Sequence, residues 1–191
     1  MRHPSLEGRS NVPAESLLDV LTRLWQIKLQ SIELLERWTK SAQDSDVKAG
    51  ISAQLNDERR HLRLLADEIK QRGGRQPSTV DHVVTKAFAL AQSQPNDMLK
   101  LCAFHRGIKA STYERCYRLM NLAGPAISGL LDEMLHDEDR HLRWADLRLR
   151  PISGEDVRRC NALLEKMTIA MEAAWSRPWR HLAPSRLSYL G

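Results

Sequence analysis

The sequence predicts an all-α protein in which two helical hairpins form a four-helix bundle, with a short crossover helix and an appended C-terminal helix. Three observations predict this fold class. Apolar residues recur at three- and four-residue spacing over long windows, the strict alternation typical of strands is absent, and glycine and proline fall between the periodic segments. We expect the 191 residues to form one domain, with the bundle core at about 14–150 and the C-terminal helix and tail at 151–191.

The four long helices have recognisable ends. The polar AQDSD segment should close the first hairpin, Gly73 and Gly74 should end its second helix, and Pro125 suits the first turn of the last bundle helix. The long helices are therefore expected at about residues 14–41, 46–72, 97–121 and 125–150.

Two shorter segments complete the expected fold. A short helix at about 81–92 should lie in the crossover between the hairpins. A capping pattern that begins at Ser153 should start a fifth helix that ends near Ser176. We expect the remaining tail to pack irregularly through Trp179 and Tyr189.

Composition narrows the class of protein. No stretch approaches the roughly 20 apolar residues of a membrane-spanning helix, and the first residues lack the apolar segment of a signal peptide, so we expect a cytoplasmic protein without a membrane partner. Three cysteines without C-x-x-C spacing indicate reduced thiols rather than a disulfide framework. A net charge of +5 without a compact basic run is only a weak indication of an RNA partner.

One charged heptapeptide occurs twice, as DERRHLR at 57–63 and DEDRHLR at 137–143. Its glutamates, Glu58 and Glu138, each interrupt a stripe of apolar residues that should face the bundle interior. Those stripes consist of Ile51, Leu55, Leu62, Leu65 and Ile69 in the first copy, and Leu131, Leu135, Leu142, Ala145 and Leu149 in the second. A buried carboxylate needs a compensating charge, so both glutamates are candidate site residues.

A histidine follows each of these glutamates after three residues. His61 and His141 should lie one turn along on nearly the same face, where Glu and His can reach a common metal ion. Glu133 and His136 have the same spacing but lie on the polar side of their helix, so we interpret that pair as solvated.

The first helix of each hairpin offers a further carboxylate. Glu33 precedes Glu58 by 25 residues and Glu114 precedes Glu138 by 24, so each hairpin should bring its two glutamates to a similar height. Glu36 is the alternative to Glu33, with a separation of 22. Two divalent cations would balance the four carboxylates, and carboxylate with imidazole suits iron or manganese.

This ligand pattern resembles the ferritin-like di-iron carboxylate superfamily over about residues 14–150. The resemblance implies two Fe ions, with Mn or mixed Mn/Fe as alternatives. Their ligands would be the bridging Glu58 and Glu138, the more terminal Glu33 and Glu114, and the histidines His61 and His141.

The resemblance also implies a function. An oxidase or hydroxylase that activates dioxygen and acts on an organic substrate is the first expectation, and a homodimer is one expected assembly. The layout is similar to the tRNA isopentenyl-adenosine hydroxylase family, which would make RNA a partner. The first alternative is a ferroxidase or iron-storage protein without an organic substrate. Two others are a structural bundle that a metal ion only stabilises and a bundle that binds no metal.

Two features near the expected site have alternative interpretations. Tyr117, one turn beyond Glu114, would be an electron or hydrogen-bond donor at the metals or a structural tyrosine. Gly107, Ala110 and Ser111 would leave space above the metals or allow close helix packing.

Overall fold

The computed structural model describes residues 13–179, and this part of the chain contains helices and turns but no strand. The prediction of an all-α protein is confirmed. In order, the helices are α1 (Ala14–Ser41), α2 (Ser45–Gln71), α3 (His82–Gln92), α4 (Asp97–Leu101), the π-helical η1 (Cys102–Lys109), α5 (Ala110–Met120), α6 (Pro125–Leu149) and α7 (Gly154–Trp179).

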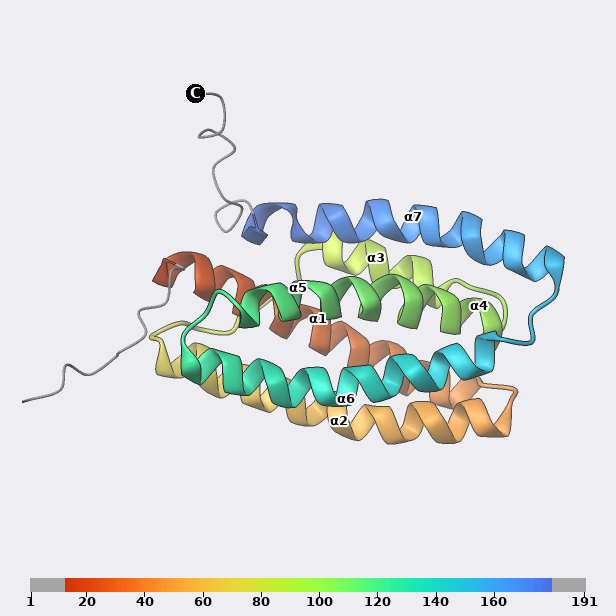
Figure 1. The fold of residues 1–191 in the computed structure, drawn as a ribbon, viewed down its shortest axis with the longest axis horizontal. Coiled ribbons are helices and arrows are strands. Elements are labelled where there is room, and N and C mark those ends of the chain that lie inside the picture. Colours follow the sequence, from red (N-terminus) through yellow and green to blue (C-terminus); the bar gives the residue numbers. More distant parts are fainter. Residues whose placement is uncertain (1–12, 180–191) are drawn as a thin grey trace, which may run out of the picture.

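The long helices form two hairpins (Figure 1). The first consists of α1 and α2, and the second consists of the continuous run α4–η1–α5 and the returning α6. Helix α2 packs against α6, so the second helices of the two hairpins are neighbours. Helix α7 packs along α3 and η1, on the side of the molecule away from α2 and α6 (Figure 1).

Caps and turns fix the ends of the helices. The Asp44 carboxylate accepts hydrogen bonds from the backbone N–H groups of Asp46 and Val47, which caps α2. Gly73, with a φ of 77°, follows the end of α2 in the left-handed region that suits glycine. The Asp97 carboxylate accepts from Trp38 Nε1 at 2.6 Å and from the Gln43 N–H at 2.8 Å, so it joins the α1–α2 turn to the start of α4.

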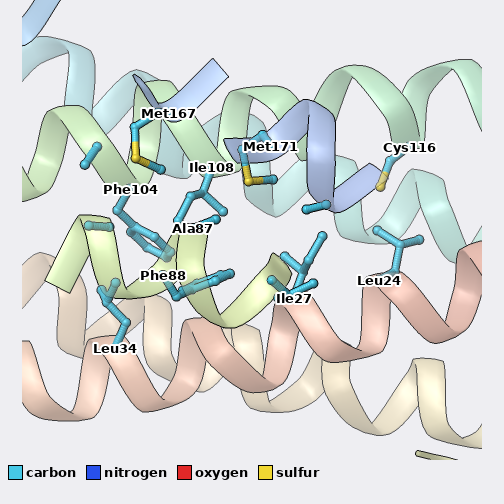
Figure 2. Close-up of a cluster of buried hydrophobic side chains, with 14 of the residues drawn as sticks. Leu24, Ile27, Leu34, Ala87, Phe88, Phe104, Ile108, Cys116, Met167 and Met171 are labelled. Atoms are coloured by element: carbon cyan, nitrogen blue, oxygen red, sulfur yellow. The ribbon is translucent and has the colours of Figure 1, made fainter. Parts of the chain in front are cut away.

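The apolar core contains buried side chains from every helix, and one part of it lies between α1, α3, η1 and α7. Figure 2 shows Met167 and Met171 of α7 directed toward Phe104 and Ile108 of η1. Gly107 faces the same helix, and a Cβ added there would lie 2.9 Å from the Met167 Cβ. The small residue at 107 therefore allows close packing of η1 against α7, rather than leaving space above a site.

The structure departs from the expected elements in two places. The predicted helix 97–121 contains eight residues in π conformation, whose wider turns a search for 3.6-residue periodicity does not reveal. Helix α7 continues past the expected end near Ser176 to Trp179, while Tyr189 lies outside the described residues. None of the helices within 13–179 is long and apolar enough to cross a bilayer.

Candidate functional site

Ionisable side chains from all four long helical segments meet at the centre of the bundle. Each segment has a buried stripe with alternating three- and four-residue spacing, and a charged residue interrupts each stripe. These residues are Lys28 on α1, Glu58 on α2, Lys109 at the end of η1 and Glu138 on α6, and none is more than 5 % exposed.

The two lysines connect the two glutamates. The Lys28 ammonium lies 3.1 Å from Glu58 Oε2 and donates a hydrogen bond to Glu138 Oε1. The Lys109 ammonium donates to Glu58 Oε1 and, at 2.7 Å, to Glu138 Oε2. Each ammonium thus contacts both carboxylates, and each carboxylate contacts both ammoniums.

The two histidines turn one ring nitrogen toward this centre. His141 Nδ1 accepts a hydrogen bond from the Lys109 ammonium at 3.2 Å. His61 Nδ1 lies 3.8 Å from Glu138 Oε1 and has no hydrogen-bond partner among the described residues. The histidines are therefore placed alike, but only one of the two inner nitrogens is hydrogen-bonded.

The aspartate that begins each heptapeptide accepts a hydrogen bond from the histidine of the other copy. His61 Nε2 donates to Asp137 Oδ2 at 3.0 Å, and His141 Nε2 donates to Asp57 Oδ2 at 2.9 Å. The repeat thus forms a reciprocal cross-link between α2 and α6. These aspartates are the acceptors that fix the tautomer and orientation of the two rings.

Arginines from the same repeats complete the outer layer. Arg60 donates to Asp137, and Arg140 donates to Asp57 at 2.8 Å and lies 2.9 Å from the other Asp137 oxygen. The centre and this layer together contain four carboxylates and four basic side chains, so their formal charges cancel without a metal ion.

Burial and charge act in opposite directions on the ion pairs. Burial alone would raise the pKa of Glu138, but the Lys109 and Lys28 ammoniums hold that pKa well below its ordinary value. Burial alone would lower the pKa of Lys28, but Glu138 and Glu58 raise it above its ordinary value. Lys28 therefore stays protonated at neutral pH and is not a nucleophile.

The environment keeps His61 neutral. Burial, reinforced by the Lys28 charge, lowers the pKa of His61 from 6.5 to about 4. The Asp137 carboxylate accepts a hydrogen bond from the remaining ring N–H, at Nε2. The pKa of Asp137 is held low, despite its burial, by this hydrogen bond and by two arginines. The free Nδ1 of His61 is consequently a lone-pair donor.

Four of the six predicted metal ligands converge: Glu58, His61, Glu138 and His141. Glu33 and Glu114 do not reach the centre, because their side chains are 43 % and 59 % exposed and pair with Arg37 and Arg118. This corrects the expected ligand set. The residues that do reach the centre, Lys28 and Lys109, lie five positions earlier in the sequence. Five residues correspond to a rotation of about 140° around an α-helix, so the glutamates face a different direction.

The other candidates also lie at the surface. Glu36, the alternative to Glu33, is 44 % exposed and pairs with Arg59. Glu133 and His136 are exposed, as expected for the pair interpreted as solvated. Tyr117 is 52 % exposed and therefore is not a donor within the buried centre.

The donor set does not fit a di-iron centre. Two of its four expected carboxylates lie on the surface, and two cationic side chains stand in the centre instead. A smaller set remains, because Glu58, Glu138 and His141 offer ligand atoms within 4.8 Å of one another. Those three side chains, however, are the ones that bind the Lys109 ammonium.

Two cavities lie beside the outer layer. One of about 540 Å³ is lined by acidic, tyrosine and apolar side chains of α5 and α6 together with Arg60, and it reaches Asp137. A smaller one of about 170 Å³ reaches Asp57 and His141 beside Trp144. The larger cavity therefore reaches only the aspartate of the Asp137–His61 pair, whereas the smaller one reaches both members of the Asp57–His141 pair.

Comparison of the chain with protein-family models, with curated protein sequences and with solved structures found no match.

The lowered pKa of His61 predicts a specific pH dependence of stability. The unfolded chain takes up this proton near pH 6.5 and the folded chain only near pH 4, so acid favours unfolding. We expect His61 to contribute a loss of about 2 kcal/mol between pH 7 and pH 5. Chemical denaturation should show a flatter pH dependence for His61→Gln and an unchanged one for the exposed-site control His136→Gln. Equal slopes for all three proteins would contradict the assignment.

Lys109→Met should destabilise the fold strongly, because it leaves two buried glutamates with one ammonium. Removal of one partner of a buried ion pair costs about 3–5 kcal/mol. Urea denaturation at pH 7 measures this loss. Lys86→Met, at an exposed lysine of α3, is the matched control and should change the unfolding free energy by less than about 0.5 kcal/mol. A comparable, small effect at both positions would contradict the ion-pair centre.

Proposed function

We propose that this protein is a ferritin-like helical bundle that works without a metal ion, as a binding protein rather than an oxygen-activating enzyme. The position of the Lys109 ammonium carries this proposal. It is hydrogen-bonded to Glu58, Glu138 and His141, the three side chains that could otherwise bind a metal ion. A metal ion there would have to displace a buried, ion-paired ammonium.

The chemistry of the centre supports a role other than catalysis. Oxidases, hydroxylases and ferroxidases of the di-iron class need four carboxylates at the metal centre. Here Glu33 and Glu114 lie at the surface, so only two carboxylates reach the centre. A nucleophilic lysine is disfavoured as well, because the two glutamates hold the Lys28 ammonium in its protonated form. The ion pairs instead connect four helical segments at one level of the bundle.

Metal analysis tests this proposal. Protein expressed under iron-replete conditions, or incubated anaerobically with Fe²⁺ or Mn²⁺ and then gel-filtered, should contain far less than one metal ion per chain by plasma mass spectrometry. EDTA should leave its thermal unfolding midpoint unchanged, because the ammoniums already neutralise the glutamates. Stoichiometric metal, with a midpoint that falls in EDTA, would contradict the proposal and restore the oxidase and ferroxidase hypotheses.

The 540 Å³ cavity favours a ligand-binding function in particular, because its volume is typical of small-molecule sites. Its lining combines Tyr113, Tyr117 and the apolar Leu135 with more carboxylates than cations. Such a lining suits an organic cation, whose ammonium pairs with a carboxylate while its apolar part contacts the rings.

Calorimetric titration with phenethylamine and phenylacetate, which differ in the sign of their charge, tests the cavity. Phenethylamine should bind and phenylacetate should not. Asp132→Asn should weaken amine binding at least about threefold, because it removes a carboxylate of the lining, whereas Asp67→Asn on the exposed face of α2 should have no effect. Equal binding of both probes would exclude a cation site.

A further inference from the structure

Each of the two lysine ammoniums contacts both central glutamates. Glu58 and Glu138 each hold both cations, as bridging carboxylates do in a dinuclear site. We propose that this centre is a latent dinuclear metal site, from which Lys28 and Lys109 exclude two divalent cations by filling their positions. This inference rests on the proposed metal-free state of the natural chain.

The histidines are already arranged as metal ligands. Each directs Nδ1 toward the centre and donates its Nε2–H to an aspartate of the other heptapeptide. This outer hydrogen bond is what holds a metal-bound imidazole in the correct tautomer. His61 Nδ1 in particular is buried and has no hydrogen-bond partner within residues 13–179, so one ligand atom is available without breaking any contact in that part of the chain.

Substitution of Lys28 and Lys109 by glutamate would supply the two carboxylates that a dinuclear site still lacks. A glutamate side chain is one bond shorter than a lysine, so at position 28 or 109 its oxygen would stop short of the place where the ammonium now lies. Metal–oxygen bonds of about 2.0–2.2 Å are long enough to bridge that gap. A metal ion at the former ammonium position would then contact the new carboxylate and both existing glutamates.

Charge balance agrees with this geometry. Two ammoniums neutralise two glutamates in the natural chain. After Lys28→Glu and Lys109→Glu the centre would hold four carboxylates, which two divalent cations neutralise. Carboxylate and imidazole donors together favour Fe²⁺, Mn²⁺ or Zn²⁺ over Ca²⁺.

The double variant K28E/K109E tests the inference. Reconstituted anaerobically with Fe²⁺, or in parallel with Mn²⁺ or Zn²⁺, and gel-filtered, it should retain about two ions per chain. Because four uncompensated carboxylates cannot remain buried, its helical circular-dichroism signal should depend on the added metal and disappear in EDTA. The control K70E/K86E makes the same charge change at exposed lysines of α2 and α3, and should bind no metal and stay folded in EDTA.

The variant K28M/K109M provides a second measurement. It removes both ammoniums but keeps Glu58, Glu138, His61 and His141. One divalent cation neutralises the two glutamates, so we expect about one ion per chain. The inference is overturned if both variants are folded and bind no more metal than the control, or if both remain unfolded when metal is present. Stoichiometric metal in the natural chain is a different result, because it would refute the proposed metal-free function and, with it, the exclusion of metal by the lysines. Failure of both variants would overturn the inference alone and leave the metal-free function standing.

Discussion

The pairing of two buried ammoniums with two buried glutamates is the interaction on which the arrangement of this bundle depends. Lys28, Glu58, Lys109 and Glu138 come from four different helical segments, and each cation contacts both anions. No one segment can shift by a turn without leaving a charge unpaired in a dry interior, which is costly. Since apolar packing alone tolerates alternative registers, the ion pairs specify one arrangement of the helices.

The polar layers around the ion pairs explain why one heptapeptide occurs twice. In each copy the aspartate orients the other copy's histidine, the glutamate joins the central ion pairs, and an arginine neutralises an aspartate at the rim. The third residue, Arg59 in one copy and Asp139 in the other, forms only a surface ion pair, with Glu36 and Arg143 respectively. The residues of α2 and α6 that build the centre and its rim are therefore all among the repeated ones, and the position that differs lies outside it.

The sequence predicts the helices well because their ends are set by local chemistry, such as the Asp44 cap and the left-handed Gly73. It also predicts Glu58 and Glu138, because a charge within an apolar stripe indicates a buried partner. If a metal ion compensates the two glutamates, further carboxylates such as Glu33 and Glu114 are expected, but a cation from another helix can compensate them as well. Lys28 and Lys109 interrupt the stripes of the first helices of the two hairpins in the same way.

The role of Asp57 and Asp137 could not be derived from periodicity. Each lies next to a glutamate that faces the centre, and its partner is a histidine on another helix about eighty residues away. Only the antiparallel pairing of the two hairpins brings those residues together. The π conformation of η1 escapes prediction for a similar reason, because helical periodicity alone does not distinguish it from an α-helical turn.

Anomalous diffraction at the iron absorption edge, from crystals of protein expressed under iron-replete conditions, tests the central claim most directly. We predict no anomalous peak between Glu58 and Glu138, and electron density that places the Lys28 and Lys109 ammoniums within hydrogen-bond distance of both carboxylates. A pair of anomalous peaks between the two glutamates, with both lysine side chains turned away, would contradict the claim.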